Sequence, residues 1–241
     1  AAVCILNNWL PDEIMQSIAA ENNLAETAFV VEKENQFHIR WFTPTTEVDL
    51  CGHATLASAF VLEQFFYPQQ ALFEFYSHRS GALPVQFKDG LFTLDFPTDD
   101  LKETTIPDQL KSIFGSDVLE CYKGKTDYLL ILKDENAVAS AKPNFNDLAQ
   151  VPCRGVIISA AGKQVDFVSR FFAPQSGVDE DPVTGSAHTS LIPYWSNSLG
   201  KTKLEAKQIS NRGGYLWLEH CDQRVKISGK GVLYLKGTIY F

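Results

Sequence analysis

The sequence has no apolar run near the roughly 20 residues that a membrane-spanning helix needs, and it has no surplus of basic residues. Its 241 residues include 29 acidic and 21 basic side chains, a formal net charge of −8 at pH 7. Nonspecific binding to nucleic acid or to an anionic membrane would need basic clusters to meet the phosphates. We therefore expect no nucleic-acid partner and no membrane association.

Paired cysteines and nucleotide-binding loops are also missing. The five cysteines are odd in number and scattered, without a CxxC pair, which is typical of a reduced cytoplasmic protein that has neither a disulfide framework nor a zinc site. No His, Cys and Asp cluster shows metal-ligand spacing, and neither a GxGxxG motif nor a phosphate P-loop occurs. The sequence predicts chemistry without a metal or other cofactor.

The start of the chain is abrupt. Ala1–Leu6 already forms an apolar, strand-like run without an initiator Met. We expect that a segment precedes it in the full protein, and the residues present show neither a signal peptide nor a transit sequence.

Two segments of the chain share one plan, a glycine turn with small residues that opens into an apolar helix. In residues 50–59 the turn is at Gly52, and in residues 177–188 it is at Gly185 and Ser186, just after a run of carboxylates. The first N–H groups of a helix have no partner inside it, and residues of so little bulk let a ligand carboxylate approach the backbone. The pattern predicts two helix N-termini that bind anions, one at Gly52 and one at Gly185; we call them helix mouths.

The order of the expected elements also repeats, which indicates two similar halves, 1–107 and 108–241. The first half contains a helix at 12–22, an enclosed helix at 54–66 and a hairpin turn at 88–90. In the second half the enclosed helix is expected at 187–195, and strands are expected from there to the C-terminus.

Three residues near the first helix mouth are candidates for acid/base chemistry. Glu26 sits between a helix exit and an apolar strand, either as an ordinary turn residue or as a general base whose pKa is raised by apolar neighbours. His53 suits a helix cap and a proton shuttle equally. Cys51 lies where a helix dipole favours thiolate, although a buried, inert cysteine is the commoner case.

The second helix mouth follows three carboxylates. Asp181 precedes Pro182, which fixes the backbone and can hold the carboxylate over the mouth. Asp179 and Glu180 compete for that role, and His188 is read as a packed core histidine rather than a catalyst.

Several long motifs, in order along almost the whole chain, resemble those of one family. They are AAVC at 1–4, NLAETAF at 23–29, RWFTP at 40–44, EVDLCGHAT at 47–55, EDPVTGSA at 180–187 and RGG at 212–214. Together they resemble the phenazine-biosynthesis-type (PhzF-like) isomerase family, within the wider diaminopimelate epimerase fold.

That resemblance implies an α/β fold of two pseudo-symmetric halves, each a curved, mostly antiparallel sheet or barrel around a central helix. Glu26 is similar to the family's proton-transferring glutamate, and His53 and Asp181 match its assisting residues. Gly52, Gly185 and Ser186, with Cys51 beside them, would bind the carboxylate of a small, amino-acid-like substrate. A homodimer without a cofactor is implied.

Two alternatives stay open. Cys51 stands where amino-acid epimerases of this fold keep one of two catalytic thiols, but the corresponding place in the second half holds Thr184. An epimerase or racemase that uses Cys51 is therefore the first alternative to a Glu26-centred isomerase. The second is an interaction protein that keeps the fold with little turnover, because a fold does not determine a function.

Overall fold

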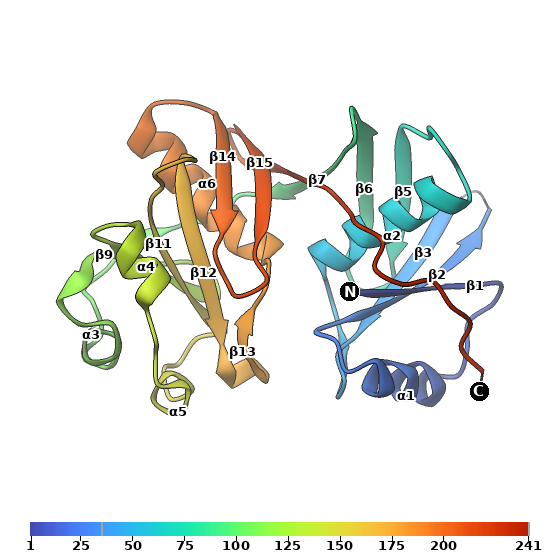
Figure 1. Cartoon of the computed structure of the whole chain (residues 1–241), viewed down its shortest axis with the longest axis horizontal. Helices are drawn as coiled ribbons and strands as arrows, with labels where there is room; N and C mark the ends of the chain where they lie inside the picture. Colours follow the sequence, from blue (N-terminus) through green and yellow to red (C-terminus); the bar gives the residue numbers. More distant parts are fainter. Residues whose placement is uncertain (35, 241) are drawn as a thin grey trace. The chain divides into compact units, whose positions relative to one another are not determined.

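The computed structural model describes residues 1–34 and 36–240, which form two compact units (Figure 1). Unit 1 contains Ala1–Asp95 and the described segment that starts at Ser228, and unit 2 contains Phe96–Ile227. The sequence placed the division after residue 107. In the structure the chain leaves unit 1 within one strand, at Asp95, and returns within another, at Ser228.

Unit 1 is a mixed sheet with two helices. Its elements are β1 (Ala2–Leu6), α1 (Asp12–Asn22), β2 (Thr27–Lys33), β3 (Gln36–Phe42), β4 (Glu47–Val48), α2 (Gly52–Phe65), β5 (Leu72–Ser77), β6 (Gly81–Lys88) and β7 (Leu91–Pro97). The strand order is β1-β2-β3-β5-β6-β7. The pairs β1–β2 and β3–β5 are parallel, and the remaining neighbours are antiparallel.

Local signals set the ends of α1 and the turn between β6 and β7, as the sequence predicted. Pro11 precedes α1, Asp12 stands in its first turn, and Asn23 ends it in the left-handed conformation at φ 46°. Asp89 and Gly90 both have positive φ, 52° and 77°, as a two-residue type I′ hairpin turn requires.

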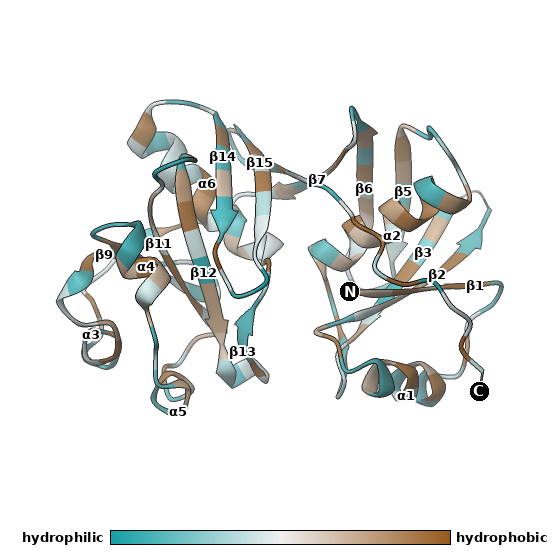
Figure 2. Ribbon diagram, in the orientation of Figure 1, coloured by the Kyte–Doolittle hydropathy of each residue, from teal (hydrophilic) through white to brown (hydrophobic). Residues whose placement is uncertain are grey.

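The central helix of unit 1 is α2, whose surface is apolar over most of its length (Figure 2). It packs against β1, β2 and β6. The C-terminal segment covers another side of it. A Cβ on Gly231 would come within 2.4 Å of the Phe60 ring, and the Lys236 ammonium lies 4.1 Å from the centre of the Phe65 ring.

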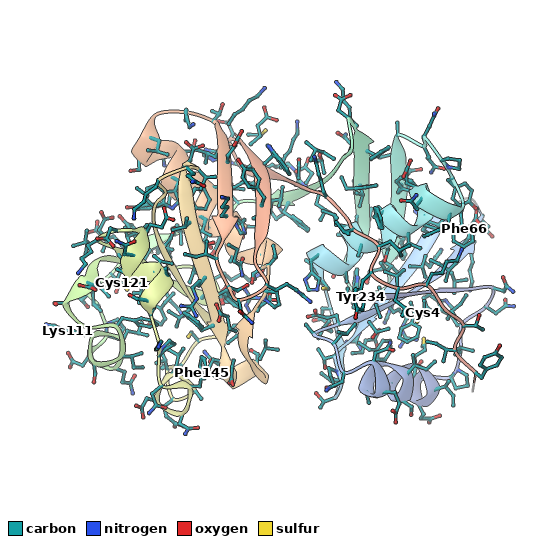
Figure 3. All side chains as sticks on the ribbon, in the orientation of Figure 1. Cys4, Phe66, Lys111, Cys121, Phe145 and Tyr234 are labelled. Carbon is teal, nitrogen blue, oxygen red and sulfur yellow. The ribbon has the colours of Figure 1, made fainter. Side chains whose placement is uncertain are left out.

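The expectation of strands to the C-terminus is wrong for the last residues. The final strand ends at Gly229, and the described residues 230–240 form neither helix nor strand. The segment contains an apolar run at 232–235, but strand propensity depends on packing against neighbours. Tyr234 instead projects into solvent (Figure 3).

Unit 2 has the same kind of architecture with more elements. They are β8 (Lys102–Glu103), α3 (Asp108–Phe114), η1 (Gly115–Asp117), β9 (Val118–Lys123), β10 (Asp127–Leu132), α4 (Glu135–Ser140), α5 (Phe145–Leu148), β11 (Gly155–Ala161), β12 (Phe167–Ala173), η2 (Pro174–Ser176), β13 (Val178–Asp181), α6 (Gly185–Leu199), β14 (Lys203–Gln208), β15 (Gly214–Cys221) and β16 (Arg224–Gly229). Its central helix is α6, which packs against β10, β14 and β15.

The two units repeat one topology. In unit 2 the pairs β10–β11 and β12–β14 are parallel, while β11–β12 and β14–β15 are antiparallel. This is the pattern of β1–β2, β3–β5, β2–β3 and β5–β6 in unit 1. Each unit is thus a curved, mostly antiparallel sheet around one central helix, as expected. Every helix in residues 1–34 and 36–240 is too short or too polar to cross a membrane.

His188 belongs to the core of unit 2, as the sequence analysis proposed. It lies on α6 with no exposed surface. Its Nδ1 lies 2.8 Å from the carbonyl oxygen of Thr184, and its Nε2 has no hydrogen-bond partner among the described residues. Burial lowers the pKa of this imidazole to about 4, against the opposing hydrogen bond to Thr184. His188 is therefore neutral near pH 7.

We predict that His188 makes the protein labile in mild acid. Its unfolded pKa is near 6.5 and its folded pKa is about 4, so the unfolded chain binds the extra proton between these values. Stability then falls as the pH drops through this window, by about 3 kcal/mol in all. His188→Leu should flatten the fall in Tm between pH 6.5 and pH 4, whatever its effect on Tm at pH 7.

The matched control for this prediction is His220→Gln, which removes a histidine at the surface-facing end of β15. It should keep the acid sensitivity of the native protein. An unchanged acid slope in His188→Leu would show that other groups cause the lability.

Candidate active site

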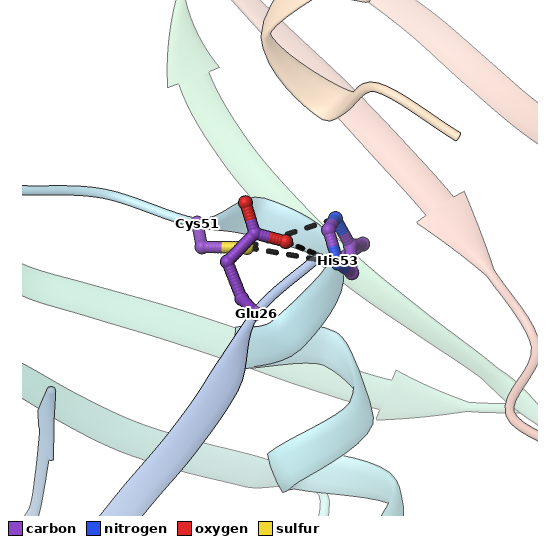
Figure 4. Close-up of side chains that lie close together, drawn as sticks. All are labelled: Glu26, Cys51 and His53. Atoms are coloured by element: carbon purple, nitrogen blue, oxygen red, sulfur yellow. Dashed lines mark hydrogen bonds and ion pairs between the residues drawn. The ribbon is translucent and has the colours of Figure 1, made fainter. Parts of the chain in front are cut away.

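Three of the residues singled out in the sequence meet in unit 1 (Figure 4). Glu26 directly precedes β2, Cys51 is the N-cap of α2, and His53 is the second residue of that helix. His53 Nε2 lies 3.0 Å from Glu26 Oε2, and Cys51 Sγ lies 3.6 Å from His53 Nδ1. The fold therefore brings Glu26 into contact with His53, although the two residues come from separate segments of the chain.

The start of α2 is held in place locally. Cys51 has an extended backbone, φ −140° and ψ 105°, and Gly52 begins the helix. The Thr55 hydroxyl donates to the Cys51 carbonyl at 2.7 Å, in addition to the backbone hydrogen bond between the same residues. Because α2 also packs on β1 and β2, its first turn stays beside the residue that opens β2.

The cluster is partly shielded from solvent. The His53 and Glu26 side chains keep 23% and 19% of their surface exposed, while Cys51 is buried. Glu26 Oε2 itself is buried and receives no well-aligned hydrogen bond, although His53 Nε2 is only 3.0 Å away. The contact is therefore an ion pair whose N–H does not point along the line to the oxygen.

Electrostatics make this pair charged near neutral pH. Burial opposes the charge of His53, but Cys51 and Glu26 outweigh it and hold the pKa of the imidazole well above its usual value. Burial raises the pKa of the Cys51 thiol against the effect of His53. Glu26 is then the anionic partner of the His53 cation.

The sign of the shift at Glu26 differs from the expectation. Burial would raise the pKa of this carboxyl, as the sequence predicted, but the His53 imidazole beside it lowers the pKa below its ordinary value. The apolar neighbours of Glu26 could be read from the sequence. The His53 cation, which outweighs their effect on the pKa, comes from another segment of the chain. Glu26 is an ionised carboxylate, ready to accept a proton.

The helix mouth of unit 2 is built from Thr184, Gly185 and Ser186. Thr184 is the N-cap of α6, and Gly185 is its first residue. The Thr184 hydroxyl donates to Asp181 Oδ2 at 2.6 Å, and Gln208 donates to the Asp181 carbonyl at 2.8 Å. Ser186 is exposed at the first turn. Asp181 thus braces the mouth of the helix.

The other two carboxylates of this segment have different environments. Glu180 is paired with Arg170, at 2.6 Å and 2.9 Å for its two oxygens, and Arg170 also donates to the Ala141 carbonyl. Asp179 is exposed. Of the three competing carboxylates, Asp181 is the one that contacts the N-cap of α6.

Arg154 is a candidate that the sequence analysis missed. Its guanidinium donates to both carboxylate oxygens of Asp127, a residue whose side chain is only 5% exposed. The same guanidinium donates to Ser186 Oγ at 3.0 Å and lies over the Phe171 ring. A guanidinium held by three hydrogen bonds and still 40% exposed is oriented to bind an anion.

Topology gives Arg154 a counterpart in unit 1. Arg154 directly precedes β11, as Glu26 directly precedes β2. Ser186 is the second residue of α6, as His53 is of α2. The contact between Arg154 and Ser186 therefore repeats the contact between Glu26 and His53 with a cation in place of the carboxylate. A charged residue just before an apolar strand was the only signal in the sequence.

Comparison with known proteins supplies the family. The family model for phenazine biosynthesis-like proteins, PhzC-PhzF, matches residues 1–237. An uncharacterized isomerase of Pseudomonas aeruginosa is 48% identical over 240 residues, which cover 100% of this chain and 92% of that protein. The chain belongs to the PhzC-PhzF family. Family membership confirms the isomerase class that was expected from the sequence, without identifying a substrate.

Solved structures of the PhzC-PhzF family and of epimerases agree with the fold. The crystal structure of a PhzF-family phenazine biosynthesis protein from Enterococcus faecalis has a TM-score of 0.96 at 45% identity, covering 99% of this chain and 92% of that one. A probable proline racemase from Agrobacterium radiobacter has a TM-score of 0.63 at 9% identity, with 99% and 89% covered. That second likeness is one of fold alone.

We predict that His53 of this PhzC-PhzF protein takes up its proton well above pH 6.5. In Glu26→Gln its pKa should fall, because burial then opposes the imidazolium without a carboxylate partner. NMR titration of the histidine rings, with His53→Gln for assignment, measures both values.

Glu21→Gln on α1 is the control, since this exposed carboxylate lies in the same unit. It should leave the titration of His53 unchanged. The same His53 pKa in Glu26→Gln as in the native protein would contradict the ion pair.

Proposed function

We propose that the protein is a cofactor-independent isomerase that moves a proton between two carbons of a small, amino-acid-like carboxylate. The observation that carries the proposal is the 3.0 Å contact between Glu26 and His53, beside the first turn of a central helix. Family membership supports the reaction class. The homodimer and the cytoplasmic location expected from the sequence stay predictions.

Glu26 is the group that carries the proton. Ionised near pH 7, its carboxylate takes a proton from one carbon, and the electron pair of the broken C–H bond moves into the substrate. Glu26 then returns the proton to another carbon and ends ionised again. One carboxylate thus serves as base and then as acid.

His53 provides the compensating charge. While Glu26 is ionised, the imidazolium pairs with it. When Glu26 takes the proton, the negative charge passes to the substrate, and the cation then has a new anion to stabilise. Fixed charges and amide dipoles that are in place before the reaction lower the barrier to such a carbanion-like state. The first-turn amides at Gly52 add to this effect.

Unit 2, taken by itself, has a device that can bind a carboxylate. We assign it to the first-turn amides of Gly185 and Ser186 together with the Arg154 guanidinium, which already donates to Ser186. A guanidinium and helix N–H groups both favour a carboxylate. Asp181 assists by fixing Thr184 at the start of α6.

An epimerase that uses Cys51 is the second candidate. The 3.6 Å contact between the Cys51 sulfur and His53 supports it. The raised pKa of the buried thiol favours Glu26 as the base instead, since a thiol must lose its proton before it can accept one from carbon.

We predict that Glu26→Gln lowers kcat by roughly 10²- to 10⁴-fold, the range of a lost general acid/base. Cys51→Ser should lower it far less. Exchange of carbon-bound hydrogen with solvent deuterium, followed by NMR on a panel of cyclic and linear amino acids, measures the proton transfer directly. Full exchange in Glu26→Gln with loss in Cys51→Ser would replace our proposal by the thiol mechanism. No exchange on any carboxylate would favour an interaction protein.

We predict that Arg154→Ala weakens the binding of small carboxylates, measured by calorimetry, by roughly 10- to 100-fold, the effect of losing a hydrogen bond to a charged group. Arg154→Lys should recover part of the loss. Arg79→Ala is the matched control, because Arg79 is also paired with a carboxylate and is 38% exposed. Equal effects of the Arg154 and Arg79 substitutions would argue against a specific anchor.

A further inference from the structure

The side chains of Glu26, Cys51 and His53 also form a set of metal ligands. Each offers one donor atom, and the three atoms lie within 4.8 Å of one another. Among residues 1–34 and 36–240, no other group of three His, Cys, Asp or Glu side chains meets this distance. The spacing in the sequence hides the set, because Glu26 comes from the segment before β2 and the other two from the start of α2.

The spacing of the donors suits a tetrahedral ion. Zinc binds sulfur at about 2.3 Å and nitrogen or oxygen at about 2.0–2.2 Å, so tetrahedral ligands lie roughly 3.4–3.6 Å apart. Cys51 Sγ lies 3.8 Å from His53 Nε2, the ring nitrogen that also faces Glu26. His53 Nε2 and Glu26 Oε2, at 3.0 Å, need to separate by only a few tenths of an ångström.

The partial exposure of the cluster leaves room for an ion to enter and for a fourth ligand. The His53 and Glu26 side chains face solvent with 23% and 19% of their surface, and the thiol of Cys51 forms the buried end of the cluster. Glu26 Oε2 has no well-aligned donor to displace. An ion held by three protein ligands and one water would match the open form of zinc site.

We propose that Glu26, Cys51 and His53 bind one thiophilic divalent ion, such as Zn²⁺, and that the bound ion inhibits the enzyme. The binding rests on the donor geometry alone, whereas the inhibition rests on the proposed role of Glu26 in proton transfer. The thiol and the imidazolium each release a proton to solvent as the ion binds. Thiolate and imidazole select zinc and its neighbours over Mg²⁺, which prefers oxygen ligands.

Cobalt titration tests the binding without any substrate. One equivalent of Co²⁺ added to the full chain should produce a thiolate-to-cobalt charge-transfer band and the visible bands of a tetrahedral ion, and Zn²⁺ should bleach them. Cys51→Ser should lose the charge-transfer band, and His53→Gln and Glu26→Gln should weaken it. Cys221→Ser, at a free cysteine at the end of β15, should keep the full spectrum.

Calorimetry with Zn²⁺ supplies the second readout. Substitutions in groups that merely support a metal ligand weaken binding by about 10–100-fold, so removal of a ligand should cost at least about 100-fold. Circular dichroism confirms that each variant is folded, and Cys51→Ala replaces Cys51→Ser if the latter is not.

The outcomes separate the two proposals. A charge-transfer band that survives in Cys51→Ser and Cys51→Ala, or equal zinc affinity in these variants and the native chain, overturns the metal site. Zinc that binds through Cys51 without slowing hydrogen exchange leaves the metal site standing and contradicts Glu26 as the proton carrier.

Discussion

The charge pair between Glu26 and His53 is the interaction on which the candidate active site depends. Each partner sets the protonation state of the other, because burial by itself would discharge both groups. Their contact exists only because the first turn of α2 packs beside the residue that opens β2. The packing of the unit 1 core therefore determines whether the ion pair forms, since any repacking that moves α2 along the sheet would separate the two charges.

Repetition of one topology explains where the functional side chains stand. In both units a charged residue precedes the second strand of a parallel pair, and the second residue of the central helix contacts it. The backbone offers the same two places twice, so the chemistry of each unit is decided by the side chains at those places. Unit 1 holds a carboxylate and an imidazole, and unit 2 holds a guanidinium and a hydroxyl.

The sequence predicted the helix ends and turns, because residues close together in the chain determine them. Asp12 and Asn23 mark the ends of α1, Asp89 and Gly90 make the hairpin, and both glycine turns open central helices. It could not predict the sign of the pKa shift at Glu26 or the role of Arg154, because each depends on a partner from a distant segment. The strand expected near the C-terminus failed for a related reason, since residues 230–240 have the apolar pattern of a strand without strand pairing.

Asymmetry between the repeated positions favours one proton carrier over two. A symmetric two-base epimerase would place equivalent bases at both helix mouths, but Cys51 corresponds to Thr184, and Glu26 corresponds to Arg154. Neither a threonine hydroxyl nor an arginine takes a proton from carbon near pH 7. The second unit has therefore kept the backbone geometry for holding an anion and lacks a base at these positions. Of the two repeated positions, the one in unit 1 therefore offers a base and the one in unit 2 offers a cation for an anion.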